Sequence, residues 1–271
     1  MPRNLMALVA FGWMFGILGC TLSKVPSRTA VVINPARVVD LTYEFGPDTI
    51  YWPTGESFRL ERVAWGKTAE GYWYAANNLC LAEHGGTHMD APIHFAEGGW
   101  SAEAVPLSSL IGPAAVIDVR AAAAANPDYE VQVADILEWE RAHGRLPNGA
   151  IVAIFTGWGR FWGNKRAYLG SDVKGDVRNL HFPGFSAAAA EFLVREREIA
   201  AVAIDTASID PGASRQFLAH RIFNGANKPA LENVANLHLL PPSGATIIAL
   251  PMKIRGGTGG PARIIAILPE H

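Results

Sequence analysis

The sequence predicts a single α/β domain, and three observations support that fold class. Short apolar runs rich in Val, Ile or Ala recur along the chain, each bounded by Gly, Pro or Asp, as is typical of buried strands. Two stretches with helical features lie between these runs. The composition agrees: 49% hydrophobic and 18% charged residues support a sizeable core, and 27 Gly and 18 Pro suit many turns.

The individual elements can be assigned from these patterns. We expect buried strands over residues 114–119, 150–155, 201–204, 246–250 and 263–268. Residues 133–143 carry apolar side chains at helical spacing, and Gly144 follows as a C-terminal cap. Ser186 can cap a second helix that runs to about residue 198 and leads directly into the strand at 201. Strands that alternate with helices indicate an α/β domain.

The first twenty residues differ from the rest of the chain. Arg3 precedes an uncharged apolar stretch, residues 5–18, which is shorter than the roughly 20 residues of a membrane span but has the length of a secretory signal. It ends in Leu18-Gly19-Cys20, which resembles a bacterial lipoprotein signal. We expect residues 1–20 to direct export to the cell envelope or periplasm, with lipid anchoring through Cys20; a plain signal peptide or an uncleaved anchor is the alternative. Residues 21–35 then form a polar tether, and residues 36–271 the domain.

Charge and cysteine content exclude other classes of protein. The formal net charge is −2 and no long basic run is present, so nucleic acid is not an expected partner. The only cysteines are Cys20 and Cys80, and with Cys20 lipidated no intramolecular disulfide can form. Cys80 lies in an apolar run, where we expect a small buried side chain.

One short segment concentrates metal-binding chemistry. Residues 84–94 read His84-Gly-Gly-Thr-His88-Met-Asp90-Ala-Pro-Ile-His94. Imidazole and carboxylate are usual ligands of zinc and manganese. Residues i and i+2 of an extended segment face the same way, so His88 and Asp90 can share one ion, and the two glycines allow a turn that returns His84 to it. A histidine is more often an ordinary residue, but this clustering favours a metal site.

This segment resembles the signature of the cyclase family, which includes bacterial kynurenine formamidases and isatin hydrolases. The resemblance implies that His84, His88 and Asp90 bind metal and that His94 is the catalytic acid and base. Downstream, the segment from Asp205 to Asp210, the pair His220 and Glu232, and the glycine-rich run 256–263 also resemble the family. His220 and Glu232 are thereby implied to complete a site for one or two Zn or Mn ions.

The resemblance covers about residues 38–268, and it implies further properties. The fold would be the family's swivelling β/β/α architecture, with a barrel-like mixed sheet, flanking helices and assembly as a homodimer. Trp52 matches a position where formamidase-like members place an aromatic ring against the substrate, and Trp100 is a second candidate for the pocket wall. For Phe58 and Trp73 core packing is the preferred interpretation. Residues 157–163, with Trp158 and Trp162, are a candidate loop over the site.

The predicted function is therefore hydrolysis of a C–N amide bond in a small aromatic or cyclic amide, isatin-like or N-formylkynurenine-like. Metal-bound hydroxide would attack the carbonyl, and His94 would transfer the proton to nitrogen. The alternative is a non-catalytic envelope lipoprotein that binds metal or a small ligand and has no need of His94. A structural zinc domain would favour several cysteine ligands, and the chain has only two cysteines.

Overall fold

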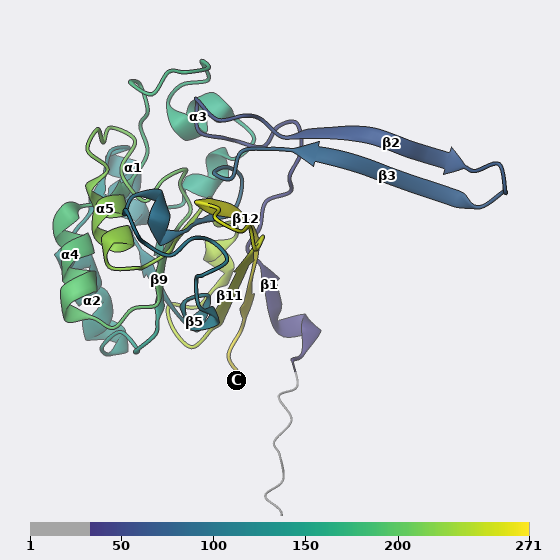
Figure 1. Cartoon of the computed structure of the whole chain (residues 1–271). Helices are drawn as coiled ribbons and strands as arrows, with labels where there is room; N and C mark the ends of the chain where they lie inside the picture. The colour runs from purple at the N-terminus through teal and green to yellow at the C-terminus, as the bar shows by residue number, and fades with distance from the viewer. Residues whose placement is uncertain (1–32, 271) are drawn as a thin grey trace, which may run out of the picture. The chain divides into compact units, whose positions relative to one another are not determined.

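A closed, barrel-like sheet forms the centre of the computed structural model, which describes residues 33–270 (Figure 1). In pairing order the barrel strands are β12 (Gly259–Ile267), β11 (Thr246–Pro251), β5 (Ile111–Asp118), β7 (Ile151–Phe155), β9 (Ala201–Ile204), β10 (Ala230–Glu232) and β4 (His88–Asp90). β4 also pairs with β12 and so closes the ring, while β1 (Val38–Asp40) extends the sheet beside β12. Strands β5, β7, β9 and β10 are parallel, and the remaining pairings are antiparallel. The predicted α/β barrel-like mixed sheet is confirmed.

Helices cover the parallel strands on the outside of the barrel (Figure 1). The main ones are α2 (Val133–His143), α4 (Ala187–Glu196) and α5 (Leu218–Gly225). Ile136, Leu193 and Phe223 from these helices share one hydrophobic cluster with outward-facing strand residues such as Val152 and Ile204. The two-stranded ladder of β6 (Glu130–Val131) with β8 (Gly184–Phe185) adds Val131 and Phe185 to this cluster. Two short helices are α1 (Arg120–Ala125) and α3 (Lys165–Leu169), and α3 packs with Trp158 in a third cluster.

The barrel interior holds a second cluster, contributed by the alternate residues of the same strands. Met89, Ile151, Leu231, Ile247 and Ile264 belong to it, and each is buried. Because side chains alternate across a strand, the neighbours of Met89 and Leu231 face outward. This alternation places His88, Asp90 and Glu232 on the outer surface of β4 and β10 rather than in the barrel interior.

Most predicted elements match the structure closely. The expected helix at 133–143 and strand at 201–204 coincide with α2 and β9, and Ser186 caps α4 by accepting from the Ala189 N–H at 3.1 Å. β12 begins at Gly259, earlier than the expected residue 263. A Cβ at Gly259 would lie 2.5 Å from the Met89 carbonyl oxygen and 2.6 Å from His84 Cε1. Only glycine therefore lets β12 approach β4 here.

A long hairpin leaves the barrel and was not predicted. It consists of β2 (Arg59–Lys67) and β3 (Trp73–Cys80), and it extends away from the rest of the domain (Figure 1); we call it the arm. None of its strand residues is buried. The predictions that Cys80 is a buried side chain and that Trp73 packs in the core are therefore wrong, since Cys80 is exposed and Trp73 is 60% exposed.

The expectations for the N-terminus lie outside the described residues. Residues 1–20 and most of the expected tether precede Ile33, and Pro35 already opens a short 3-10 helix that leads into β1. Within residues 33–270, none of the helices combines the length and the apolar character that crossing a bilayer requires.

Candidate active site

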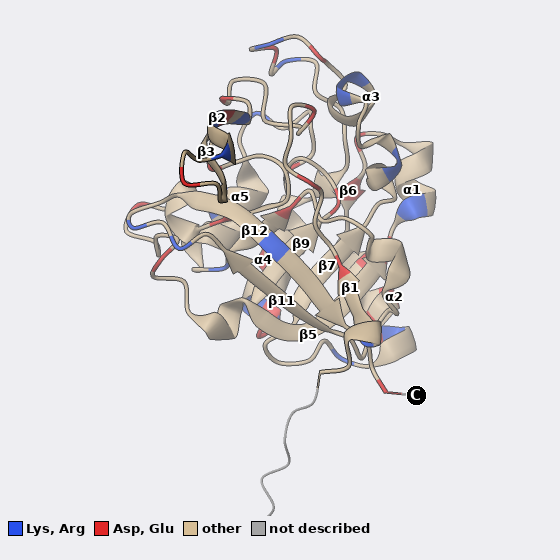
Figure 2. Cartoon of the chain, turned by 90° about the vertical axis from the view of Figure 1, so that its right-hand side faces the viewer, with Lys and Arg blue, Asp and Glu red and all other residues tan. Residues whose placement is uncertain are grey.

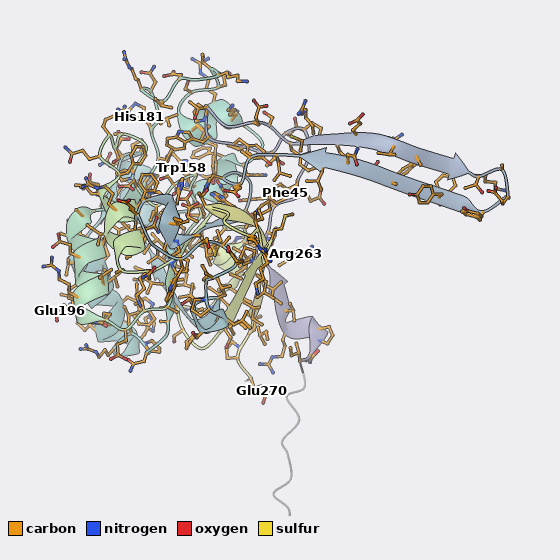
Figure 3. The ribbon with its side chains drawn as sticks, in the orientation of Figure 1. Phe45, Trp158, His181, Glu196, Arg263 and Glu270 are labelled. Carbon is orange, nitrogen blue, oxygen red and sulfur yellow. The ribbon has the colours of Figure 1, made fainter. Side chains whose placement is uncertain are left out.

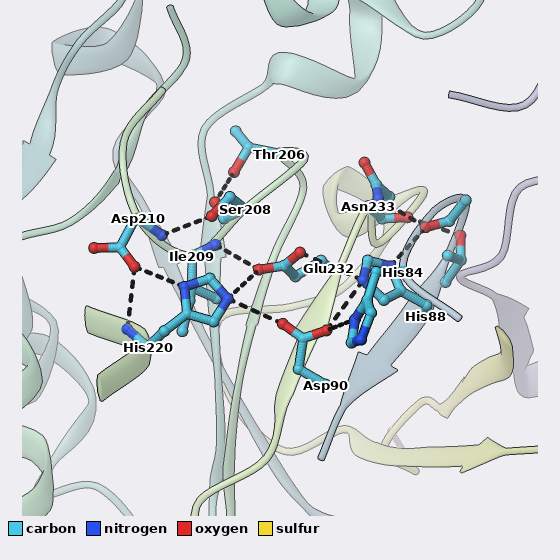
Figure 4. A network of polar contacts seen from close by, with 12 residues as sticks. His84, His88, Asp90, Thr206, Ser208, Ile209, Asp210, His220, Glu232 and Asn233 are labelled. Atoms are coloured by element: carbon cyan, nitrogen blue, oxygen red, sulfur yellow. Dashed lines mark hydrogen bonds and ion pairs between the residues drawn. The ribbon is translucent and has the colours of Figure 1, made fainter. Parts of the chain in front are cut away.

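The site is assembled on the outer surface of β4 and β10 and is closed by α5. In the antiparallel register Glu232 lies opposite His88 and Ala230 opposite Asp90, so three functional side chains share one face. Helix α5 supplies His220, and the turn before β4 supplies His84 (Figure 4). His88, Asp90, His220 and Glu232 are at most 4% exposed. The structure therefore gathers the five predicted metal ligands at one place.

Asp90 lies at the centre of the cluster (Figure 4). Its Oδ1 lies 2.6 Å from His84 Nδ1 and 3.2 Å from His88 Nε2, and its Oδ2 lies 3.0 Å from His220 Nε2. Glu232 closes the ring, with Oε1 3.2 Å from His220 Nε2 and Oε2 3.5 Å from His88 Nε2. Nitrogen and carboxylate oxygen donors thus converge on a small volume.

The outer partners of His88 and His220 determine which of their ring nitrogens carry protons. His88 Nδ1 lies 3.0 Å from the Gly86 carbonyl oxygen, and His220 Nδ1 lies 2.6 Å from the Asp210 carboxylate. Both partners only accept, so both Nδ1 atoms are donors. The inward Nε2 atoms are then left with lone pairs in the neutral rings, which is the arrangement that metal-binding histidines use.

His84 is fixed by a longer chain of hydrogen bonds. The Thr258 hydroxyl donates to Glu83 Oε2 at 2.6 Å, and it therefore accepts from His84 Nε2–H at 2.8 Å. The Thr258 backbone N–H donates to the same Glu83 oxygen at 2.9 Å. This chain turns the Nδ1 lone pair of His84 toward Asp90. Neither Glu83 nor Thr258 was predicted as a functional residue, although Glu83 precedes His84 and Thr258 lies within the glycine-rich motif.

This donor set fits a divalent cation. Three imidazole lone pairs and two carboxylates meet with no proton between them in the neutral tautomers, and the buried His88 Nε2 has no hydrogen-bond partner. Coordinating atoms of His84, His88 and Asp90 lie within 4.8 Å of one another, as do those of Asp90, His94 and His220. Zinc and manganese both accept such ligands.

The pKa values reflect the same crowding of buried charge. Burial would lower the pKa of His220, but the carboxylates of Asp210, Asp90 and Glu232 outweigh it and hold the pKa well above its ordinary value. Burial together with the Asp90 charge raises the pKa of Glu232. Two carboxylates this close repel each other, and a cation between them relieves that repulsion.

His94 lies beside the cluster and is free to act on a substrate. Its ring stacks on that of His84, with centroids 3.8 Å apart and planes 18° apart. The two ring nitrogens of His94 make no hydrogen bond to the described residues. Burial lowers the pKa of His94 to about 4, so the imidazole is neutral at pH 7. A neutral imidazole beside this candidate metal site can accept a proton.

A cavity of about 290 Å³ opens onto these groups. His84, His88, Asp90, His94, His220 and Glu232 form its polar side, and Ile50, Trp52, Phe95, Ala207 and Phe217 contribute to its apolar side. The rings of Trp52 and Phe217 meet edge to face with centroids 6.2 Å apart. The ring centroids of Phe95 and Phe217 are 5.3 Å apart. Phe217 has φ 49° and ψ 48°, a left-handed conformation that is uncommon for an aromatic residue.

Other predicted residues lie elsewhere. Trp52 lines the cavity, but Trp100 does not, and its backbone N–H donates to Asn227 Oδ1 at 3.1 Å. The expected loop over the site, residues 157–163, also does not line the cavity. Its Trp158 (labelled in Figure 3) is buried in the cluster that also contains the cavity residues Ile50 and Ala207. It donates through Nε1 to the Tyr168 carbonyl oxygen at 2.7 Å.

Comparison with known proteins agrees with this geometry. The family model named Cyclase matches residues 39–211. An isatin hydrolase of Roseibium aggregatum is 33% identical over 249 residues, which cover 86% of this chain and 92% of that protein. The chain belongs to the cyclase family. A kynurenine formamidase of Erythrobacter litoralis is 28% identical over 235 residues, 86% of this chain and 95% of that protein. The solved structure of isatin hydrolase A from Ralstonia solanacearum has a TM-score of 0.77 at 34% identity, covering 86% of this chain and 92% of that one.

Family membership and the donor cluster together define the class of enzyme. The chain is a metal-dependent amide hydrolase of the cyclase family, and its His and Asp cluster is suited to a metal ion. The predicted recognition and enzyme class are confirmed.

Proposed function

We propose that this cyclase-family enzyme opens a planar cyclic amide fused to an aromatic ring, as in isatin. The observation that carries the proposal is the cavity, in which aromatic side chains stand across from the polar cluster. A flat bicyclic substrate can place its ring against Trp52 and Phe217 while its carbonyl faces the cluster. The higher identity to an isatin hydrolase than to a kynurenine formamidase, 33% against 28%, also supports this choice.

His84, His88, Asp90, His220 and Glu232 are the residues that would hold the metal. When bound, a divalent ion polarises a carbonyl and lowers the pKa of water from 15.7 to about 7. Glu83 and Thr258 hold His84, Asp210 holds His220, and the Gly86 carbonyl holds His88, so the coordinating nitrogens are oriented before any ion binds.

His94 would carry the proton through the reaction. Its neutral ring accepts a proton from the attacking water, whose oxygen bonds to the carbonyl carbon. The C–N bond then breaks, and the same ring returns the proton to the departing nitrogen. The balance is one water added across one amide bond, which gives a carboxylic acid and an arylamine. Isatin would yield a product that keeps both groups on one molecule.

A substrate panel tests the proposal. Isatin, N-formylkynurenine, a simple cyclic imide and a lactone are offered to the metal-loaded full chain, with and without chelator. We expect chelator-sensitive hydrolysis with the highest kcat/KM for isatin. A higher kcat/KM for N-formylkynurenine would reassign the substrate class to open-chain formamides. Absence of turnover with metal bound would favour the alternative, a binding protein.

We also propose that the enzyme acts at the cell envelope, anchored through Cys20. Support comes from the sequence of residues 1–20, which resembles a lipoprotein signal. Fractionation of the producing cells tests this. The wild-type chain is expected with the membranes and the Cys20→Ala variant in the soluble fraction, whereas an identical distribution of the two would contradict lipid anchoring.

A further inference from the structure

A second cavity lies at the mouth of the barrel, where the parallel strands end. It measures about 420 Å³, within the roughly 300–1,000 Å³ typical of small-molecule sites. Among the described residues it shares none of its lining with the catalytic cavity. Phe155, the last residue of β7, and Asp205, which follows β9 directly, both line it. The carboxyl ends of parallel strands are where α/β sheets and barrels commonly bind their ligands, and the active site on β4 and β10 leaves this position unused.

Two exposed arginines line this second cavity. Arg120 is the only charged residue of α1 (blue on that helix in Figure 2), and it lies just beyond the end of β5. Residues 157–163, which were expected over the catalytic cavity, instead place Arg160 here. A Cβ at Gly157 would lie 3.1 Å from Arg120 Cγ and 3.6 Å from Arg160 Nη1, so both arginines pack against this glycine. The cavity therefore has a cationic rim.

The two guanidinium groups have donors left over for a ligand. Arg120 donates from Nε and Nη2 to the Asp118 carboxylate, at 3.0 and 2.7 Å, and its Nη1 has no partner among the described residues. The Arg160 guanidinium makes neither a hydrogen bond nor an ion pair to residues 33–270. Its Cζ lies 4.5 Å from the centroid of the Phe161 ring. Since a guanidinium stacked on a ring keeps its N–H groups at its own edge, Arg160 can donate to a planar anion.

Asp205 is the carboxylate among the lining residues, and its charge is compensated within the fold. Its Oδ1 accepts from the Thr156 backbone N–H at 2.9 Å and from the Thr156 hydroxyl at 2.6 Å. Its Oδ2 accepts from the Trp158 backbone N–H at 3.1 Å. The residue is only 3% exposed. Because Asp118 likewise neutralises Arg120, the uncompensated charge at the rim is the positive charge of Arg160.

The floor of the cavity is apolar. Val234 and Leu237 belong to the hydrophobic cluster of the barrel interior, and Phe155 packs against that cluster. Tyr43 forms part of the wall and is fixed by stacking on Trp162, with ring centroids 3.9 Å apart and planes 6° apart. Burial raises the pKa of Tyr43, so the phenol keeps its proton, and the hydroxyl makes no hydrogen bond to the described residues. It is therefore a third donor for an anion.

We propose that this cavity is a second ligand site, which binds a small monocarboxylate with a flat apolar body. The carboxylate would pair with the Arg160 guanidinium through two hydrogen bonds and accept from the Tyr43 hydroxyl and from Arg120 Nη1. The apolar body would cover the floor. A phosphate group would bring a second negative charge beside Asp205 and would leave the apolar floor uncovered. The site is separate from the catalytic cavity, so its test requires no turnover.

The test follows benzoate binding to the zinc-loaded full chain by NMR of isotope-labelled histidine rings. His238 lines the second cavity and His94 lines the catalytic cavity, so their resonances report on the two cavities separately. The resonances are assigned with the His238→Gln and His94→Ala variants. We expect millimolar benzoate to shift the His238 resonance. Benzamide, which has a similar shape without the charge, should leave it in place, and acetate, which lacks the ring, should bind more weakly than benzoate.

Variants of the lining test the roles of individual side chains. Arg160→Gln and Tyr43→Phe are compared with Arg195→Gln, which removes an exposed arginine on α4, outside the cavity. Loss of the charged donor should raise the benzoate Kd by about 10-fold or more in Arg160→Gln. Tyr43→Phe should raise it by a smaller factor, and Arg195→Gln should leave it unchanged. Circular dichroism checks that each variant is folded.

Several results would overturn the assignment of this second site. The first is a His238 resonance that benzoate leaves unmoved in the wild-type chain. The second is benzamide that binds as tightly as benzoate, since the cationic rim would then contribute nothing. The third is a folded Arg160→Gln variant with the wild-type Kd. Benzoate that shifts only the His94 resonance would place the carboxylate in the catalytic cavity and would remove the second site.

Discussion

The hydrogen-bond chain behind His84 offers a precise test of how the site is organised. In Thr258→Val the side chain keeps its shape but loses the hydroxyl that accepts from His84 Nε2 at 2.8 Å and donates to Glu83 at 2.6 Å. His84 then loses the partner that directs its Nδ1 lone pair toward Asp90. Loss of such an outer partner typically costs 10- to 100-fold in metal affinity, about 1.4–2.7 kcal/mol.

The assay is a competition titration of the metal-stripped chain with Zn²⁺ and Mn²⁺ against a chromogenic chelator. Thr258→Ser, which keeps the hydroxyl, should restore most of the affinity. Thr54→Val is the matched control, because Thr54 lines the same cavity at its exposed edge. Wild-type metal affinity in Thr258→Val would refute the view that this chain of hydrogen bonds orients His84.

Three more predictions concern the acid and base, the close packing of β12 and the stability of the domain. His94→Ala should retain its metal and lose 10²- to 10⁴-fold in kcat, and equal turnover would remove His94 from the mechanism. Gly259→Ala should lower metal occupancy, because its Cβ would lie 2.6 Å from His84 Cε1, whereas Gly46→Ala, with no atom within 4 Å of the added Cβ, should not. Glu140→Gln should lower the free energy of unfolding at pH 7 by about 3 kcal/mol, since Arg197 donates twice to this mostly buried carboxylate at 2.7 Å. Hydrogen bonding from Arg197 lowers the pKa of Glu140 in the folded protein. The carboxylate's contribution to the free energy of unfolding is therefore complete above the unfolded pKa of about 4.3, and it is lost as the pH falls through the folded pKa. A difference in unfolding free energy between wild type and variant that does not shrink at acid pH would contradict this.

The parts of the fold that could be predicted are those in which a continuous apolar run or a terminal glycine marks the element locally. Strand β9 is buried at every residue and α2 is closed by Gly144, so both boundaries follow from local pattern. The start of β12 could not be found in this way. Gly259 and Gly260 contribute no apolar side chain to a strand pattern. They pair with β4, and the missing Cβ at Gly259 permits that close approach.

The arm was not predicted, for a different physical reason. Its tryptophans and leucines suggest burial, which led to the wrong expectation for Trp73, but its own chain provides no core for them. A local pattern of apolar residues therefore does not show whether their side chains are buried within the chain's own core.

The residues of the candidate site likewise differ in whether a local sequence pattern could predict them. His84, His88, Asp90 and His94 were predictable because they cluster within one segment, and their geometry follows from a turn and a short strand. His220 and Glu232 were predictable only from the family resemblance. The roles of Glu83 and Thr258 depend on a contact between residues 175 positions apart, which no local pattern contains.

We propose that this cluster holds a divalent ion that is needed for opening a cyclic amide. The most direct measurement is the initial rate of isatin hydrolysis by the full chain, as purified, after chelation, and after stoichiometric return of Zn²⁺ or Mn²⁺, with metal content determined on the same samples. We expect the rate to be lost with the metal and to recover when either ion fills the site. Isatin hydrolysis that continues at an undiminished rate in metal-free protein would contradict it.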